Sequence, residues 1–428
     1  MASWGRARLG DLVETQKGYA FKSGWYCDTG RSIVKVSDFT NDSVDSSELV
    51  CIPESTATDY LKYELRTGDV VVQTVGSWPT NPASVVGKCV RIPESVAGAL
   101  LNQNAVKLTP AVSFDRTFLF YLLRNEDFKT YIIGTAQGAA SQAAITLDAI
   151  RGYEFNLPPL PAQQRIAGIL SAYDELIENS QRRIKVLESM ARALYREWFV
   201  NFRFPGHESV PRVPSSLGEI PQGWEVKKLG ELLNVDKGVS YNGAGLTEDG
   251  NPMVNLKNIQ AGGGFRRDAT KPYSGDFKSR HTVKPGDVVL ANTDLTQAGN
   301  VVASPALIPR LEDDKPILIS HHLYAVRPVQ QIAPIFVYHL MLTDGFRGFA
   351  KGFAIGTTVL GLPKEGILNY SFACPPSELI CDFVVRASAI HELTETLYER
   401  IDNLRRTRDL LLPRLLSGQL SDQTFAPS

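Results

Sequence analysis

Residues 166–198 read IAGILSAYDELIENSQRRIKVLESMARALYREW. Mostly apolar residues recur in this stretch at alternating intervals of four and three, which is the heptad spacing of a coiled-coil seam. At about 1.5 Å of rise per residue, a helix over this stretch is roughly 50 Å long. The seam positions are Ile166, Leu170, Tyr173, Ile177, Ser180, Ile184, Leu187, Ala191, Leu194 and Trp198. The spacing predicts one long helix whose apolar stripe needs a partner.

A second seam in the same register follows 217 positions later. Its positions are Phe383, Ala387, Ile390, Thr394, Leu397, Ile401, Leu404, Arg408, Leu411 and Leu415. Two such stripes in one chain are expected to bury each other. The alternative is that each helix packs on its own globular domain. Length argues against the alternative, because a domain of about 150 residues has a radius of gyration of roughly 15 Å.

The rest of the chain is duplicated as well. Matched segments are Leu9-Gly10-Asp11 with Leu229-Gly230-Glu231, Lys17-Gly18 with Lys237-Gly238, Gly68-Asp69-Val70-Val71 with Gly286-Asp287-Val288-Val289, and Pro158-Pro159 with Pro375-Pro376. The shift between partners falls from 220 to 217 along the chain. A repeat of this size indicates two domains with equivalent surfaces, not a solenoid of small repeats.

The duplication predicts an α+β chain: two similar mixed α/β globular domains separated by two long helices that form an antiparallel coiled coil. The expected boundaries are 1–160 for the first domain, 161–204 for the central helix, 205–376 for a linker and the second domain, 377–418 for the C-terminal helix and 419–428 for a tail. Short β-branched runs predict strands at Ile33–Val36, Val70–Val72, Val85–Val86 and Ala105–Leu108. Helical spacing predicts a helix over Phe114–Tyr131, matched by one from about Pro334 to Phe349.

Composition excludes several classes of protein. The chain of 428 residues carries 43% hydrophobic residues but no apolar run of the roughly 20 residues that a membrane span needs. The first residues show no apolar signal region, so we expect a cytoplasmic protein. Five cysteines without a Cys-x-x-Cys pair indicate reduced thiols. A net charge of −1 is not that of a free-standing nucleic-acid binder, although residues 262–284 carry six basic side chains.

Catalytic templates are absent. The sequence contains no Gly-x4-Gly-Lys-Ser/Thr loop and no His-Glu-x-x-His motif. His321-His322 is the only adjacent pair among six histidines, and neighbours on a strand point to opposite faces. We therefore expect no catalytic residue, no metal and no cofactor, as in a recognition or scaffold protein.

Four segments carry a resemblance to a known family. Trp224–Gly230 opens a domain, Lys284–Leu290 lies within it, Leu157–Ile166 leads into the central helix, and Arg196–Gly206 leaves that helix. With these segments the chain resembles the specificity subunit of Type I restriction–modification systems over essentially its whole length. The segment leading into the helix, LPPLPAQQRI, is the most specific of the four.

The resemblance implies two target-recognition domains, each reading one half of a split site in double-stranded DNA. Two methyltransferase (modification) subunits would pack on the paired helices, and ATP-dependent restriction subunits could join them. The chain itself would be non-catalytic and would direct adenine methylation and restriction by its partners. Cys374–Ile380, at the start of the second helix, lacks the Gln-Gln of the first, so docking there is expected to differ. Loops that differ between the domains predict an asymmetric target.

Candidate DNA contacts are polar or aromatic residues beside glycine-marked loops. In the first domain they are Lys17, Tyr19, Lys22, Ser77, Trp78, Thr80, Gln137, Ser141 and Gln142. In the second domain they are Lys237, Tyr241, Asn242, Lys257, Asn258, Arg266, Arg267, Thr293, Gln297, Lys351, Thr357 and Thr358. Each could instead be an ordinary loop residue, and Trp78 could simply cap the core.

Two other classes of function fit parts of the pattern. A structural adaptor would use the helices as a scaffold and the two domains to bind proteins. An enzyme with an unrecognised site would need to turn over a substrate alone. DNA binding is distinguished from both by a steep dependence on salt, because counterions are released from the duplex.

Overall fold

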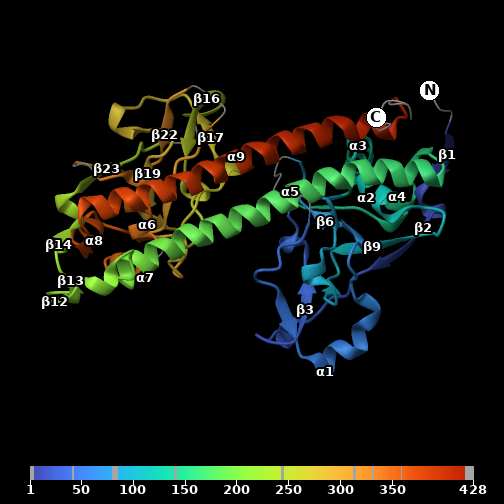
Figure 1. Ribbon diagram of the computed structural model, residues 1–428. Coiled ribbons are helices and arrows are strands. Elements are labelled where there is room, and N and C mark those ends of the chain that lie inside the picture. Colours follow the sequence, from blue (N-terminus) through green and yellow to red (C-terminus); the bar gives the residue numbers. More distant parts are fainter. Residues whose placement is uncertain are drawn as a thin grey trace, which may run out of the picture. The chain divides into compact units, whose positions relative to one another are not determined.

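The chain divides into two compact units. The computed structural model describes residues 4–40, 43–79, 85–138, 142–241, 245–311, 315–329, 332–357 and 359–419. The first unit comprises residues 1–179 and 401–428, and the second comprises residues 180–400. Each unit therefore contains one mixed α/β domain together with part of each long helix (Figure 1). Parts of both long helices thus belong to each unit.

An antiparallel four-stranded sheet forms the centre of the first domain, in the order β2-β9-β5-β7. Its strands are β2 (Val13–Lys17), β9 (Ala105–Pro110), β5 (Val70–Gln73) and β7 (Cys89–Arg91). A smaller sheet contains β4 (Val50–Ile52), β3 (Arg31–Val34) and β8 (Leu100–Leu101), and β1 (Gly5–Arg8) pairs with β11 (Glu154–Leu157). All four residues of β5 are buried, because both of its faces are covered. Three of the four predicted strands are present, whereas Val85 forms only an isolated bridge.

Helices cover this sheet, and the helix predicted over 114–131 is in fact two. These are α2 (Arg116–Arg124) and α3 (Glu126–Gly134), separated by Asn125, whose backbone is extended. The helix predicted from about 334 to 349 is divided in the same way, into α6 (Pro334–Met341) and α7 (Asp344–Lys351). The Thr343 hydroxyl accepts a hydrogen bond from the amide of Phe346 and so caps α7. A break in the helical backbone at Asn125 and a capping threonine at 343 thus divide helices that the apolar periodicity predicted as continuous. The short helices α1 (Glu54–Ala57) and α4 (Leu147–Arg151) complete the first domain.

The second domain repeats the strand order of the first. Its main sheet is β15-β23-β19-β21, formed by Leu233–Lys237, Leu323–Pro328, Val288–Ala291 and Pro305–Leu307. Its second sheet is β17-β16-β22-β18, formed by Lys271–Tyr273, Leu246–Val254, Ile317–Ile319 and Thr282–Val283. Strand β14 (Glu225–Lys228) pairs with β25 (Ser371–Cys374), and α8 (Glu365–Leu368) precedes β25. The segment before this domain forms a hairpin of β12 (Arg212–Ser215) and β13 (Gly218–Pro221).

The long helices follow the predicted seam. Helix α5 (Leu160–Tyr195) ends in a π-helical turn over Arg196–Val200, and α9 spans Ser377–Leu416. In the first unit Leu170 of α5 and Leu415 of α9 share one core, and in the second unit Tyr195 of α5 stacks edge-on against Phe383 of α9. The start of each helix therefore meets the end of the other, which confirms the antiparallel pair.

Each helix segment also packs on its own domain. The core of the first unit combines Leu170 with Val72 of β5 and Phe118 of α2. The core of the second unit combines Phe383 with Leu290 of β19 and Phe336 of α6. The helices pack on each other as expected, and they also pack on their own domains, which the length argument had opposed. No helix in the described ranges has the length and hydropathy that crossing a bilayer requires.

Candidate nucleic-acid interface

Loops from distant parts of the first domain meet at one end of its main sheet. The amide of Gly18, after β2, donates to the carbonyl of Ala105 at 3.0 Å. The amide of Thr74, after β5, donates to the carbonyl of Asn104 at 2.8 Å. Strand β6 (Val75–Gly76) then pairs with β10 (Ala143–Ala144), so the chain near 143 joins the same end of the sheet.

Several predicted contacts of the first domain lie in this loop cluster. Lys17 ends β2 with its side chain exposed, and Tyr19 follows it. Gln137 exchanges two backbone hydrogen bonds with Ala144, at 2.9 and 2.8 Å, and its side chain is exposed. Gln142 is exposed next to β10. The fold therefore brings together polar residues that are more than a hundred positions apart in the chain.

An aromatic group borders this cluster. Tyr19 packs against Phe21, Tyr60 and Tyr63, with ring centroids 4.5 to 5.4 Å apart. Trp25 lies 5.8 Å from Tyr60, and the predicted contact Lys22 lies 5.5 Å from the Trp25 ring. Sequence reasoning missed Trp25, Tyr60 and Tyr63, because only folding brings the segments near 20 and 60 together.

Two further predicted residues of the first domain are less exposed. Ser77 is 8% exposed, and Trp78 is partly buried against the main core. Trp78 therefore packs on the core, as the simpler interpretation expected. Thr80 and Ser141 lie outside the described residues.

The second domain builds the equivalent cluster. Lys237 ends β15 with its side chain exposed, and β20 (Thr293–Asp294) pairs with β24 (Leu360–Gly361). The Gln297 amide donates to the carbonyl of Thr357. Tyr241 lies 5.8 Å from the ring of His321. Lys351 ends α7, the helix that leads into this loop region.

Asp294 holds the loop after β20 in place. Its carboxylate accepts hydrogen bonds from the amides of Thr296 and Val301, at 2.9 and 2.7 Å. Burial raises the pKa of this carboxyl, but the hydrogen bonds lower it by more. The pKa of Asp294 therefore lies below its ordinary value. A charged, fully bonded carboxylate thus orders the segment that carries Thr293 and Gln297.

A basic cleft of about 430 Å³ adjoins this cluster. Its cationic lining consists of Lys237, Arg280 and Lys364, all exposed, beside His281 and Asp236. Three cations around one cleft suit the phosphates of a nucleic-acid backbone. Sequence reasoning named Lys237 as a contact but not Arg280 or Lys364, which come from widely separated loops.

Two predicted contacts make interactions within the domain, Asn258 as a buried residue and Arg267 with its side chain 23% exposed. Asn258 is fully buried, and its side-chain amide donates to the carbonyl of Arg266 and to the hydroxyl of Thr270. Arg267 forms an ion pair with the buried carboxylate of Glu395 on α9. These interactions stabilise the domain, and the DNA-contact role of both residues stays a prediction. Glycine-marked loops predicted polar residues there, but the pattern does not distinguish inward from outward side chains.

Lys257 and Arg266 are exposed on the same segment as Asn258. Asn242 and Thr358 lie outside the described residues.

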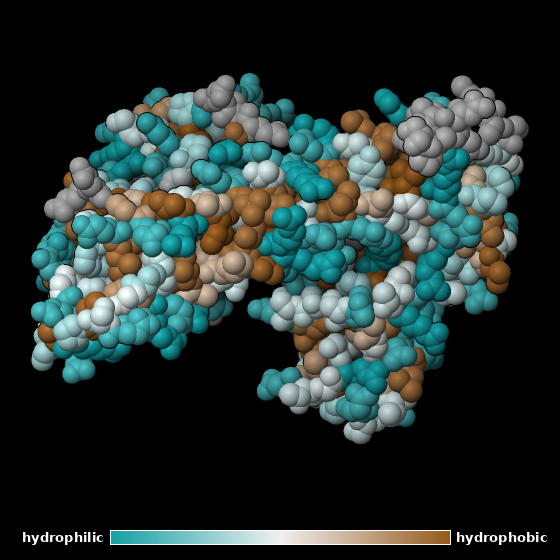
Figure 2. All heavy atoms as spheres, viewed as in Figure 1, coloured by the Kyte–Doolittle hydropathy of each residue, from teal (hydrophilic) through white to brown (hydrophobic). Residues whose placement is uncertain are grey.

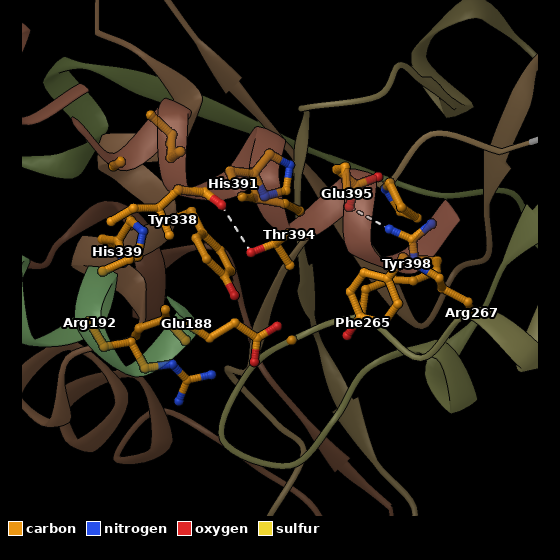
Figure 3. Close-up of a pocket in the computed structure, with 18 residues that line it drawn as sticks. Glu188, Arg192, Phe265, Arg267, Tyr338, His339, His391, Thr394, Glu395 and Tyr398 are labelled. Atoms are coloured by element: carbon orange, nitrogen blue, oxygen red, sulfur yellow. Dashed lines mark hydrogen bonds and ion pairs between the residues drawn. The ribbon is translucent and has the colours of Figure 1, made fainter. Parts of the chain in front are cut away.

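Arg267 also borders a cavity of about 70 Å³ between the domain and the long helices (Figure 3). Its guanidinium lies 4.2 Å from the Tyr398 ring. Glu188 and Arg192 of α5 and His391 of α9 also line the cavity (Figure 3). Burial raises the pKa of Glu188 and lowers the pKa of His391. Within the described ranges, no group of three or more His, Cys, Asp or Glu side chains is placed to hold a metal ion.

The sequence of this chain is similar to those of known proteins. Residues 1–189 match the sequence profile of the Type I restriction modification DNA specificity domain. The MjaIX specificity subunit of Methanocaldococcus jannaschii is 25% identical over 338 residues, covering 74% of this chain and 72% of that protein. The putative MjaX specificity subunit of the same organism is 24% identical and covers 92% and 88%.

A solved structure supports the fold. The S subunit of a Type I restriction–modification system from M. genitalium superposes with a TM-score of 0.50 over 96% of both chains, at 13% identity. The two mixed α/β domains and the two antiparallel long helices thus share the fold of that structure, and the sequence is similar to DNA specificity subunits of Type I restriction–modification systems.

Proposed function

We propose that this subunit reads an asymmetric, bipartite target in double-stranded DNA, one half with each domain. The recognition domains are residues 1–160 and 205–376. The observation that carries the proposal is the repeated loop cluster: the same backbone arrangement at the end of each main sheet presents different exposed side chains. Equivalent supports with different side chains suit two different half-sites.

The proposed contacts of the first domain are Lys17, Tyr19, Lys22, Gln137 and Gln142, with Ser77 at the base of the cluster. Those of the second domain are Lys237, Tyr241, Thr293, Gln297, Lys351 and Thr357, to which we add Arg280 and Lys364 from the basic cleft. Cations bind phosphates and fix the register, whereas amides and hydroxyls read base edges. Exposed Lys257 and Arg266 would serve as outlying phosphate contacts.

The long helices are the proposed docking surface for two methyltransferase subunits. They expose apolar side chains on α5 and on α9, and Figure 2 shows hydrophobic residues gathered along them. These residues are Leu176, Val186, Met190, Val385, Leu393 and Leu410, each 41 to 69% exposed. Apolar side chains exposed on a helix surface favour binding to another protein.

The chemistry belongs to the partners in this proposal. The methyltransferase subunits methylate adenine, and ATP-dependent restriction subunits cleave DNA when they join the complex. The specificity subunit determines the DNA sequence on which its partners act. Its place of action in this proposal is the cytoplasm, where chromosomal DNA is available.

Reconstitution tests the proposal. The full chain is combined with the methyltransferase subunit of its source organism and incubated with a library of random duplexes. We expect selected duplexes to share two short, different motifs at a fixed spacing, with binding that weakens steeply as salt rises. Selection of no split motif, or binding that is insensitive to salt, would contradict the proposal.

A further inference from the structure

The turn before β9 is fixed by backbone contacts from two other loops. The amide of Gly18 donates to the carbonyl of Ala105, and the amide of Thr74 donates to the carbonyl of Asn104, at 3.0 and 2.8 Å. A Cβ atom on Gly18 would lie 2.0 Å from the carbonyl oxygen of Asn102, so only glycine permits this approach. The turn over residues 102–104 is therefore held rigidly at the centre of the loop cluster.

The second domain holds its own turn in the same way, 218 positions later. The amide of Gly238 donates to the carbonyl of Leu323, and the amide of Asn292 donates to the carbonyl of His322, at 3.1 and 3.0 Å. A Cβ atom on Gly238 would lie 2.3 Å from the carbonyl oxygens of Ile319 and Ser320. Both backbone hydrogen bonds that hold the first turn thus have an equivalent in the second domain.

The side chains on the two turns are different. The first turn carries Gln103 and Asn104, and the second carries His321 and His322, all four of them partly exposed. A rigid support that is repeated within one chain, carrying different hydrogen-bonding groups, is the arrangement that two different base sequences require.

Unsatisfied polar atoms recur at matching positions of this support. In the first domain the Oε1 atom of Gln103 and the Oγ1 atom of Thr74 are buried without a hydrogen-bond partner in the described part of the chain. In the second domain the same holds, among the described residues, for the Nδ1 atom of His321 and the Oδ1 atom of Asn292. Buried polar atoms in proteins are nearly always bonded. Ordered water would complete the bonding at these positions.

The histidine pair is ordered and neutral. The two imidazole rings lie 3.9 Å apart, and the Thr293 hydroxyl lies 2.9 Å from the Nδ1 atom of His322. Burial lowers the pKa of both imidazoles, and the nearby Lys237 ammonium lowers it further. A neutral imidazole has one donor and one acceptor, as a base edge in the major groove often has.

Cations beside the second turn complete the site. Lys237 belongs both to the surroundings of the histidines and to the basic cleft with Arg280 and Lys364. A phosphate bound in this cleft would bring the neighbouring base edges towards His321 and His322.

We propose that Gln103-Asn104 and His321-His322 are the specificity-determining residues of the two domains, each pair reading base edges of one half-site in duplex DNA. This inference rests on the proposed function and adds to it the residues that read the sequence. Because amide side chains form paired hydrogen bonds with adenine, we expect the half-site of the first domain to contain an adenine at the position read.

Mapping of methylated adenines in a methylation-free host tests the proposal. The full chain is expressed with its methyltransferase partner, as wild type, as Gln103→Ala/Asn104→Ala and as His321→Ala/His322→Ala. We expect the first variant to lose about tenfold or more of its base preference in one half-site only, and the second variant to lose it in the other half-site only. Each variant is the control for the other, and Glu94→Ala/Ser95→Ala, an exposed pair on another turn, should keep both preferences.

Other results would overturn the inference. An alanine pair that leaves its half-site unchanged, or weakens both halves equally, contradicts it. If an alanine variant does not fold, the swaps Gln103→His/Asn104→His and His321→Gln/His322→Asn keep hydrogen-bonding groups in place and must shift the preference of one half-site. A wild-type protein that yields no split motif would refute the proposed function itself, which separates that failure from failure of the residue assignment.

Discussion

The two units differ where each domain meets the long helices. In the first unit the Tyr121 hydroxyl and the Arg408 guanidinium both donate to the carboxylate of Asp174, each at 2.5 Å. Arg408 occupies a seam position and is only 4% exposed, although its side chain is charged. A tyrosine, a carboxylate and a guanidinium from three helices thus close this junction.

The same positions in the second unit leave a cavity. Tyr338 corresponds to Tyr121, His391 to Asp174 and Ala191 to Arg408, each 217 positions away. All three line the cavity of about 70 Å³ in Figure 3. The guanidinium that fills the first junction has no equivalent at position 191, and the carboxylate that would bind it is an imidazole.

Other contacts connect the second domain to the helices. Arg267 pairs with Glu395 of α9, and Arg192 of α5 donates to the carbonyl of Gly263 at 3.1 Å. Duplication therefore preserved the apolar seam and the strand order, while the polar contacts that fix each domain to the helices diverged. The apolar frame determines the fold, and the polar contacts can differ as long as each buried charge has a partner.

Arg408→Ala should have the largest effect. It leaves the carboxylate of Asp174, whose side chain is 15% exposed, without its cation, which costs about 3 kcal/mol of stability. Urea unfolding of the full chain, with hydrogen exchange over residues 160–179, measures the loss in the first unit. Arg400→Ala, which removes an exposed arginine from the same helix, is the matched control and should change little. An Arg408 variant as stable as this control would show that the ion pair contributes nothing.

Transfer of the first junction into the second should have a smaller effect. His391→Asp alone places a carboxylate in a largely buried position without its arginine and should cost on the order of 2 kcal/mol. Adding Ala191→Arg supplies the guanidinium in the cavity and should recover at least about 1 kcal/mol. Urea unfolding of the two single variants and the double variant gives the coupling. Strictly additive effects would mean that the two junctions are not equivalent.

The sequence predicted the apolar frame of these junctions because that frame is periodic. Leu170 and Phe383 follow from heptad spacing alone, and the structure buries both completely. The divided helices were missed, since the extended backbone at Asn125 and the capping hydroxyl of Thr343 interrupt an apolar pattern that continues on both sides.

The candidate site was predictable only in part. Lys17 and Lys237 follow from the matched repeats and lie in equivalent loops. The turns with Gln103 and His321 were missed, because neither residue stands beside a glycine in the chain, and Gly18 and Gly238 approach them only after folding. Asn258 was named as a contact because it lies in a loop, but its side-chain amide is buried and donates to the carbonyl of Arg266.

The smallest effect we expect is a dependence on pH in the second junction. His339 lines the cavity, and its Nδ1 atom lacks a hydrogen-bond partner in the described structure. Burial lowers its pKa to about 3, with Arg192 and His391 acting in the same direction. Because this pKa lies below the ordinary value of about 6.5, the neutral ring stabilises the fold above pH 6.5. That stability is lost by up to about 1.4 kcal/mol per pH unit as the pH falls towards 3. Glu188, whose pKa burial raises, acts in the opposite direction.

A pair of reciprocal variants isolates this contribution. Leu122 occupies the position of His339 in the first unit, and it is also buried. When the pH falls from 7.5 to 5.5, the free energy of unfolding of His339→Leu should therefore decrease by about 1 kcal/mol less than that of wild type. The free energy of unfolding of Leu122→His should decrease by about 1 kcal/mol more than that of wild type. Urea unfolding at the two pH values measures both. Equal slopes in all three proteins would mean that the buried imidazole gains a proton as easily in the folded chain as in the unfolded one, so that the cavity of the second junction does not exclude its charge.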